Sequence, residues 1–375
     1  MQRVVERSDV VVVGGGVIGL ACAWRAAQRG LKVTLLERST LGAGASGVAA
    51  GMLAPVGEAD FGEGRFAALT MAAAHAWPSF ATDLEAASGV PVPYRRCGAL
   101  WLAADADEAE ELRRQYQHRR DLGMRGDWLP PSACRELEPG LGTCAAGVLL
   151  PDEAEVDPRA VVAALVVACE RAGVHLHAHA EVVEATWDSA RLRGVVTARG
   201  ARFDARTVVA AQGCWAPAWL PVPVRPPVRP VKGQLLRLRG PSVCARIVRS
   251  ERVYLVPRAS GELVVGATTE ERGFDTTVTA GAALELLEEA YRILPGVSEL
   301  ELVEASAGLR PGSPDNAPLV GFGEVPGLVL ATGHYRNGVL LAPLTADAVA
   351  ALASGDEPIG PIRDFGPRRF AGALW

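Results

Sequence analysis

Short apolar runs and a helical pattern alternate at the start of the chain. Residues 10–13 form an apolar run that ends at Gly14, and residues 17–29 then carry small and apolar side chains at helical spacing. Gly30 is suited to end this helix, and residues 32–37 form a second apolar run. The order strand, helix, strand predicts a right-handed crossover between two parallel strands. We therefore expect a parallel sheet in the first part of the protein.

The same kinds of pattern predict the remaining elements. Helical spacing, bounded by capping residues or glycines, predicts helices over residues 66–87, 106–122, 158–171, 280–294 and 343–354. Alternating or continuous apolar runs predict strands within residues 90–103 and over residues 174–180, 192–198, 203–211, 234–240, 252–258, 262–268 and 328–333. The proline-rich segment 221–234 is predicted to connect two domains, because proline is rare in central strands. Strands before it are expected to rejoin the first sheet, and strands after it to form an antiparallel sheet.

Composition restricts the class of protein. Of 375 residues, 49% are hydrophobic and 22% are charged, which is typical of a globular protein with a sizeable core. The net charge is −5 and the basic residues are scattered, so no nucleic-acid partner is expected. Lysine occurs only at Lys32 and Lys232, so no lysine patch for a membrane surface exists. The longest apolar runs also fall short of the roughly 20 residues of a membrane span.

The cysteines and the first residues favour a cytoplasmic protein. Seven cysteines, an odd number without a Cys-x-x-Cys pair, indicate neither a disulfide framework nor a zinc site. The opening residues MQRVVERSD are too polar for a signal peptide. His175, His177 and His179 alternate along one predicted strand, but three neighbours on one strand face seldom converge on an ion. No metal site is therefore expected.

A nucleotide-binding pattern follows the first strand. Gly14, Gly16 and Gly19 stand in the order Gly-x-Gly-x-x-Gly between strand and helix, and Glu37 ends the next strand about 20 residues further on. The first glycine allows a tight turn, the second lets a pyrophosphate approach the backbone, and the third lets helix and strand pack closely. Glu37 is suited to accept hydrogen bonds from both ribose hydroxyls, which argues against NADP. A dinucleotide is expected at this turn.

Two further glycine patterns lack this context. Gly42, Gly44 and Gly47 repeat the spacing, but they do not follow a strand directly and no acid closes a following strand–helix–strand unit. Residues 321–327, GFGEVPG, precede a strand instead of a helix. With one dinucleotide site, electrons cannot pass from NADPH to a separately bound flavin. An organic substrate is therefore expected to reduce the single cofactor directly.

Several segments, in this order along the chain, resemble one protein family. They are GGGVIGLACAWRAAQRGLKVTLLER, ASGVAAGMLAP, PVKGQ, VYLVPR, LVVGAT, GLRPGSPDNAPLVG and GHYRNGVLLAP, and they span almost the whole chain. The chain resembles the FAD-dependent D-amino-acid oxidase superfamily and, within it, the glycine oxidases of thiazole and thiamine biosynthesis. The first segment is shared by many flavoproteins, whereas AAGMLAP, VYLVPR and GHYRNGVLLAP are much more specific.

The resemblance implies non-covalent FAD and the residues around it. Matched positions lie at the pyrophosphate, the ribose, the flavin, the adenine, a glycine turn and the loop beneath the flavin's pyrimidine ring. In chain order, the implied cofactor-binding residues are Gly14, Gly16, Val17, Ile18, Gly19, Glu37, Arg38, Ala45, Ser46, Ala50, Gly51, Met52, Val182, Gly213, His334, Tyr335, Arg336, Asn337, Gly338, Val339 and Leu340. Relatives that oxidise sarcosine attach FAD through a cysteine near the C-terminal part, and this chain has none after Cys244.

The resemblance also implies how a substrate is bound. Arg310 in GLRPG matches the arginine that grips the amino-acid carboxylate, for which a planar two-donor side chain is well suited. Tyr254 matches the tyrosine that donates to the same carboxylate, and Arg336 matches an arginine near substrate and flavin. For the two arginines, a purely structural role is the alternative. Some relatives carry histidine where Arg252 stands, which leaves the preferred amine open.

These expectations combine into one architecture and one reaction class. We expect an α/β fold in which a Rossmann-like FAD-binding domain with a parallel sheet, residues 1–88, 145–222 and 304–375, is interleaved with an α+β substrate domain on an antiparallel sheet, residues 89–144 and 223–303. The implied activity is oxidation of glycine, or of sarcosine or a small D-amino acid, with molecular oxygen as acceptor, in a homo-oligomer. Two alternatives are a D-amino-acid or secondary-amine dehydrogenase that reduces a quinone, and a flavin-free binding protein on this scaffold.

Overall fold

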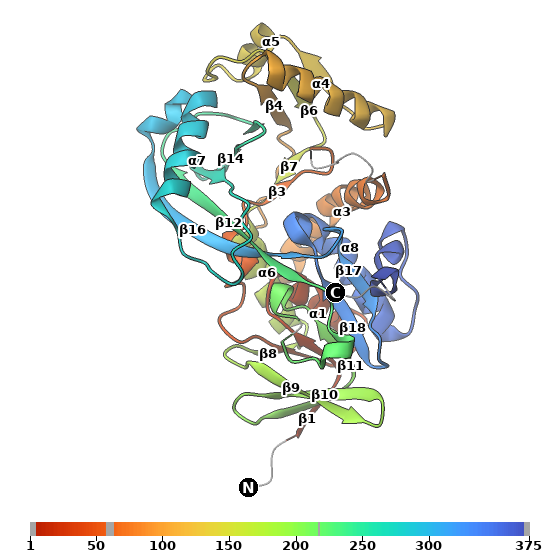
Figure 1. Ribbon diagram of the computed structural model, residues 1–375. Helices are drawn as coiled ribbons and strands as arrows, with labels where there is room; N and C mark the ends of the chain where they lie inside the picture. Colours follow the sequence, from red (N-terminus) through yellow and green to blue (C-terminus); the bar gives the residue numbers. More distant parts are fainter. Residues whose placement is uncertain (1–4, 58–63, 217, 371–375) are drawn as a thin grey trace.

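The computed structural model describes residues 5–57, 64–216 and 218–370, and two large sheets organise it (Figure 1). The first sheet consists of β1 (Val5–Val13), β2 (Val33–Leu36), β8 (His175–His177), β9 (Val182–Asp188), β10 (Arg191–Thr197), β11 (Arg202–Ala210), β17 (Leu319–Phe322) and β18 (Leu328–Thr332). Its main order is β17-β18-β11-β1-β2-β8. From β18 to β8 all neighbours are parallel, while β17 and the β9–β10 pair add antiparallel strands.

Helices bury one face of this sheet. They are α1 (Val17–Gln28), α6 (Pro158–Arg171) and α8 (Gly338–Ser354), and α3 (Gly64–Ser88) packs on α6 and α8. Trp24 of α1, Trp77 of α3 and Leu341 of α8 are buried in one apolar cluster. By length and composition the stretch Tyr335–Ser354 could cross a membrane, but 78% of its apolar window is buried inside the protein. The apolar character of α8 is therefore explained by its central position against α1 and α3.

The second sheet is almost entirely antiparallel. It consists of β4 (Ala99–Ala103), β5 (Asp127–Leu129), β6 (Ala146–Leu150), β12 (Arg229–Arg239), β13 (Ile247–Arg249), β14 (Tyr254–Pro257), β15 (Glu262–Gly266) and β16 (Glu301–Gly312). The order is β16-β12-β15-β14-β13-β4-β6-β5, and only the β13–β4 pair is parallel. Two short strands, β3 (Met52–Leu53) and β7 (Ala154–Glu155), form a separate pair.

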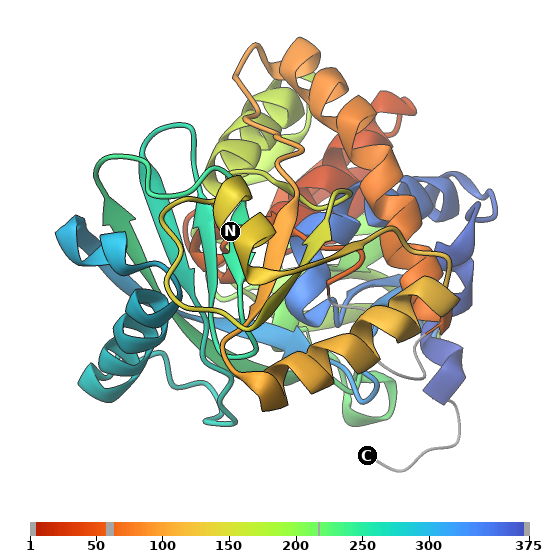
Figure 2. The ribbon, with the colours of Figure 1, turned by 90° about the horizontal axis from the view of Figure 1, so that it is seen from above.

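The two faces of the second sheet have different partners. Helix α7 (Ala280–Ile293) packs on one face through Leu286 and Ile293, and it lies on the outside of the molecule in Figure 2. On the other face, Trp101 and Val256 share an apolar cluster with Ala50, which belongs to the segment before β3. Three further helices are α2 (Ala45–Val48), α4 (Ala106–Asp121) and α5 (Pro131–Leu137). The inner face of the second sheet thus faces the carboxyl ends of the first sheet's strands.

The fold class predicted from the sequence is confirmed, since a parallel sheet and an antiparallel sheet are both present and the chain passes between them more than once. The six predicted helices correspond to α1, α3, α4, α6, α7 and α8. The prediction that residues 221–234 are a connection was wrong from Arg229 onward, where β12 begins. Pro230 is tolerated because it lies near the start of the strand and faces Pro311 of β16, so neither residue needs an N–H donor there.

Sheet membership differs from the predicted domain ranges at two strands. Strands β6 and β16 belong to the second sheet, although the predicted ranges 145–222 and 304–375 group them with the first. The predicted strand 174–180 is shorter, because β8 ends at His177 and the backbone of His179 has a positive φ of 56°. Strands β3, β5, β6, β7, β9, β13, β16 and β17 and helices α2 and α5 were not predicted. The domain boundaries themselves stay a prediction.

Candidate active site

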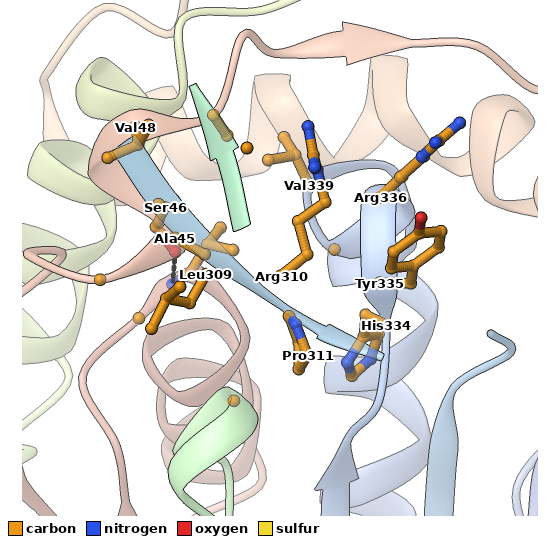
Figure 3. A pocket seen from close by; sticks show the side chains of 18 of the residues that line it. Ala45, Ser46, Val48, Leu309, Arg310, Pro311, His334, Tyr335, Arg336 and Val339 are labelled. Carbon is orange, nitrogen blue, oxygen red and sulfur yellow. Dashed lines mark hydrogen bonds between the residues drawn. The ribbon is translucent and has the colours of Figure 1, made fainter. Parts of the chain in front are cut away.

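A cavity of about 640 Å³ lies between the carboxyl ends of the first sheet and the inner face of the second sheet. One wall comes from the ends of β1, β2, β11 and β18 and from α2, and the other from β12 to β16. Figure 3 shows Ala45, Ser46 and Val48 on one side and Arg310 and Tyr335 across the cavity from them. Ligands commonly bind outside the carboxyl ends of the strands in open α/β sheets.

The turn after β1 has the geometry of a phosphate-binding turn. Gly14 has a φ of 114°, which an L side chain rarely adopts, and a Cβ on Gly19 would lie 1.9 Å from the carbonyl oxygen of Gly14. Gly16 precedes α1 without a capping side chain, and no acidic residue stands in the first turn. The N–H of Val17 donates to Ser46 Oγ at 3.0 Å. The positive end of α1 therefore opens toward the cavity and is suited to a pyrophosphate.

The carboxylate of Glu37 is fixed by the backbone. Its Oε2 accepts a hydrogen bond from the N–H of Gly15 at 2.7 Å, and its Oε1 accepts one from the N–H of Ser39 at 2.9 Å. A carboxylate has about four acceptor positions, so each oxygen keeps capacity for a ribose hydroxyl. The guanidinium of Arg38 stacks on the ring of Trp215 at 4.0 Å, and both line the same end of the cavity.

The start of α8 forms a second polar wall. His334 is buried, its Nε2 lies 3.0 Å from Thr345 Oγ1, and burial lowers its pKa to about 3. The imidazole is therefore neutral at physiological pH. Helix α8 begins after Asn337 without a side-chain cap and without an acidic residue in its first turn, and Gly338 and Val339 line the cavity. The N-terminus of α8 thus presents positive dipole to the cavity.

These walls fit FAD. The open end of α1 matches a pyrophosphate, the fixed Glu37 carboxylate matches a ribose diol, and a long cavity at the strand ends has room for both rings. The N-terminus of α8, which is the positive end of the helix dipole, would stabilise an electron-rich ring in the cavity. The donor and acceptor set of this chain therefore agrees with the cofactor that the sequence predicts.

The three predicted substrate residues also line this cavity. Arg310 Nη1 donates to the carbonyl oxygens of Thr268 at 3.0 Å and Lys232 at 3.3 Å, and no acidic side chain among the described residues pairs with the guanidinium. Arg336 Nη2 donates to Thr269 Oγ1 at 3.1 Å. In Figure 3, Arg310 from β16 and Arg336 from the turn before α8 extend to the same side of the cavity.

Two glycines make room for the substrate residues. A Cβ on Gly233 of β12 would lie 2.3 Å from Arg310 Nη2, and a Cβ on Gly266 of β15 would lie 2.5 Å from the Tyr254 hydroxyl oxygen. Both side chains thus lie directly over glycine backbone. Each glycine belongs to a segment on which the family resemblance rests, PVKGQ and LVVGAT, so the sequence carried a signal for them.

Most predicted cofactor residues lie together. All of them line the cavity except Gly19, Asn337 and Leu340. Gly19 acts through close packing on Gly14, and the carbonyl oxygen of Leu340 accepts a hydrogen bond from Trp77 Nε1 at 2.9 Å. Sequence reasoning missed Trp215, Thr269 and Arg249, which also line the cavity. No motif marks these residues, and strand pairing alone brings Arg249 to this face.

Two of the three alternating histidines lie close to one carboxylate. His175 Nδ1 lies 2.9 Å from Glu6 Oε1, and His177 Nε2 lies 3.5 Å from Glu6 Oε2. Within residues 5–57, 64–216 and 218–370, no group of three or more histidine, cysteine or acidic side chains is placed to hold a metal ion. His175 and His177 thus both lie next to Glu6 at the edge of the first sheet.

Comparison with known proteins defines the class. Residues 9–352 match the family described as FAD dependent oxidoreductase, and the chain belongs to that family. The glycine oxidase of Geobacillus kaustophilus (strain HTA426) is 33% identical over 98% of this chain and 99% of its own length. The crystal structure of glycine oxidase from Geobacillus kaustophilus has a TM-score of 0.92 at 34% identity and covers 98% of this chain and 100% of that chain.

A third relative has a longer chain. The bifunctional protein ThiO/ThiG of Synechocystis sp. (strain ATCC 27184 / PCC 6803 / Kazusa) is 35% identical over 97% of this chain, which spans 54% of that protein. The predicted family, the predicted FAD cofactor and the predicted fold class are confirmed by these matches. The roles of individual site residues stay predictions.

Proposed function

We propose that this protein is an FAD-dependent oxidase that converts glycine to glyoxylate, ammonia and hydrogen peroxide. The observation that carries the proposal is the position of Arg310, a guanidinium without an acidic partner in a cavity that fits FAD. The likeness to glycine oxidases over nearly the full length of both chains supports it. Sarcosine and small D-amino acids are further candidate substrates.

Arg310 and Tyr254 are proposed to hold the substrate carboxylate. A guanidinium offers two parallel N–H donors to a carboxylate, and the phenol of Tyr254 adds a third donor. Arg310 is already oriented by two backbone carbonyls, so little conformational freedom is lost when a carboxylate binds. The proposed task of these side chains is to place the Cα–H bond of the substrate against the cofactor.

The reaction needs positioning more than acid or base chemistry. When bound, FAD supplies a two-electron acceptor for the hydride of the Cα–H bond, and molecular oxygen then takes these electrons to become peroxide. The substrate amine is neutral, so its lone pair stabilises the positive charge that develops at carbon. Water hydrolyses the resulting imine to glyoxylate and ammonia. His334 lines the cavity, but its pKa of about 3 keeps the imidazole neutral, so it is no imidazolium acid for this chemistry.

The proposal is tested by a peroxide-coupled assay over glycine, sarcosine and small D-amino acids. Arg310→Ala is expected to raise KM for glycine strongly, by about tenfold to a hundredfold, because a charge-assisted pair to the carboxylate is lost. The FAD content per chain should stay unchanged. An unchanged KM would contradict the carboxylate assignment, and a lack of peroxide with every amine would contradict the oxidase.

Several finer points rest on the family resemblance. We propose that FAD is bound without a covalent link, that the enzyme acts in the cytoplasm as a homo-oligomer, and that its product supplies thiazole synthesis for thiamine, in line with the name of the ThiO/ThiG relative. Denaturation should release the flavin, and light scattering should give the oligomeric state. A quinone-reducing dehydrogenase would release no peroxide. A flavin-free binding protein would stay colourless after addition of FAD, which the fit of the cavity disfavours.

A further inference from the structure

Arg249 lies beside the proposed substrate residues on the same face of the second sheet. It is the last residue of β13, and it pairs with Tyr254 of β14 on one side and with Trp101 of β4 on the other. Residues that pair directly across neighbouring strands direct their side chains to the same face, with strands about 4.8 Å apart. Arg249 therefore begins one strand away from Tyr254, and it lines the same cavity.

Two nitrogens of the Arg249 guanidinium lack a hydrogen-bond acceptor. Its Cζ lies 4.1 Å from the centre of the Trp101 ring, and a Cβ on Gly57 would lie 3.1 Å from its Nη1 and 3.3 Å from Oε1 of Glu153. Within the described part of the chain, neither Nε nor Nη1 has a hydrogen-bond acceptor, although both atoms are buried. Buried donors without an acceptor are costly, and the nearby oxygen of Glu153 already accepts from the N–H groups of Val56 and Gly57. The indole holds the group in place but leaves its donors unsatisfied.

The substrate end of the cavity carries more positive charge than one substrate carboxylate would neutralise. At the substrate end, the charged residues that line the cavity are Arg249, Glu251, Arg252, Arg310 and Arg336. Arg252 donates to Glu289 at 3.3 Å and is thereby occupied. Arg310 is assigned to the carboxylate common to all amino acids. Arg336 is hydrogen-bonded to Thr269, and Arg249 remains as a further cation on the cavity wall, placed against an aromatic ring.

We propose that Arg249 binds a second carboxylate of the substrate, so that the enzyme accepts amino acids with an additional acidic group on the nitrogen or on the side chain. The inference rests on the proposed function, because it takes Arg310 and Tyr254 as the site of the first carboxylate. Glycine has only one carboxylate and therefore lies outside this substrate class. Arg249 acts in specificity and takes no part in bond breaking.

The test compares pairs of amines that differ in one charge. D-Aspartate is compared with D-asparagine, and iminodiacetate with sarcosine, in the peroxide assay with holoenzyme. Arg249→Gln is expected to lower kcat/KM for at least one dicarboxylate by about tenfold or more, the scale of one charge-assisted hydrogen bond. Glycine, sarcosine and D-asparagine should change less than about twofold, since their single carboxylate stays on Arg310. Arg249→Lys should restore part of the loss.

A matched control separates this role from packing. Arg113 stacks on Trp128 at 4.3 Å, much as Arg249 stacks on Trp101, but it lies outside the cavity. Arg113→Gln should leave all four amines unchanged. If Arg249→Gln lowers kcat/KM equally for the charged and uncharged member of each pair, Arg249 is structural and the inference is overturned.

A binding measurement keeps the inference apart from the proposed function. Succinate and its monoamide succinamate are titrated into the holoenzyme by calorimetry, which needs no turnover. Succinate should bind about tenfold more tightly than succinamate, and Arg249→Gln should remove that difference. Equal affinities in the unmodified protein would overturn the inference even if glycine is oxidised. A preference that depends on Arg249, without oxidation of any amine, would defeat the proposed oxidase while the anion site stands.

Discussion

A methyl group added at Gly233 should displace Arg310. Gly233 lies on β12, and Arg310 on the neighbouring strand β16 pairs with Val231, two residues before Gly233 on the same face. An added Cβ would lie 2.3 Å from Nη2 and 2.5 Å from Cζ of Arg310, whereas ordinary contact begins at 3.4 Å. Strand β12 is paired with β16 over its whole length, so the side chain is expected to move and not the strand.

The size of the effect follows from that distance. Restoring 3.4 Å from 2.3 Å requires the guanidinium to move by about 1.1 Å. A misplacement of about 1 Å in a positioned group costs about a hundredfold in rate. We therefore expect Gly233→Ala to lower kcat/KM for glycine about a hundredfold, mainly through KM, because the carboxylate contact is made both in the bound substrate and in the transition state.

The assay is peroxide release at several glycine concentrations, with flavin absorbance per chain measured in parallel. Gly281→Ala in α7 is the matched control, since no atom lies within 4 Å of its Cβ position and it should stay at wild-type activity. Unchanged flavin content in Gly233→Ala would show that the cofactor site is intact. A KM within about twofold of wild type, with FAD bound, would refute the assignment of Arg310.

Two further outcomes are expected. Glu37→Gln should weaken FAD binding about tenfold or more, because an amide NH₂ would face one of the N–H groups of Gly15 or Ser39 and leave it unsatisfied. The pKa of His334 is about 3 in the folded protein and has the ordinary value of 6.5 in the unfolded chain. As pH falls, the imidazole is therefore protonated in the unfolded chain before it is protonated in the folded protein. Its contribution to stability is complete above pH 6.5 and is lost as pH falls toward 3, by roughly 1.4 kcal/mol per pH unit.

The controls for these outcomes are direct. Flavin fluorescence titration measures the affinity of Glu37→Gln, and an affinity equal to wild type would contradict the ribose assignment. For His334, the melting temperature is followed from pH 7.5 to pH 4.5 in wild type and in His334→Asn. The variant should show a shallower decline, and parallel curves would show that the imidazole is not kept neutral by burial.

The cofactor end of the site could be predicted from local patterns in the sequence. Gly14, Gly16 and Glu37 lie within one strand–helix–strand unit, and contacts between neighbours in sequence are readable from spacing. Arg310 and Tyr254 were found only through the family resemblance, since they lie far apart in the chain and no local pattern links them. The structure places both at one cavity.

Arg249 and β12 show why the rest could not be predicted. Nothing around Arg249 distinguishes it from other arginines, and its position depends on its pairing with Tyr254 and Trp101 in a sheet assembled from distant segments. The start of β12 was concealed by Pro230 and the prolines before it, and Pro230 is tolerated because its partner is Pro311. Such pairings are decided by the tertiary fold, which overrides local preference.

The interleaving of the two sheets bears on how the protein is made. The turn at Gly14 leaves the ribosome first, but the cavity also needs Val339 and the strands of both sheets, and the last long helix, α8, packs on the first, α1. A nascent chain therefore cannot retain the flavin until nearly all of it has been translated. For the same reason, no continuous piece of the gene encodes either sheet alone, and a fragment that ends before α8 would be expected to remain without cofactor.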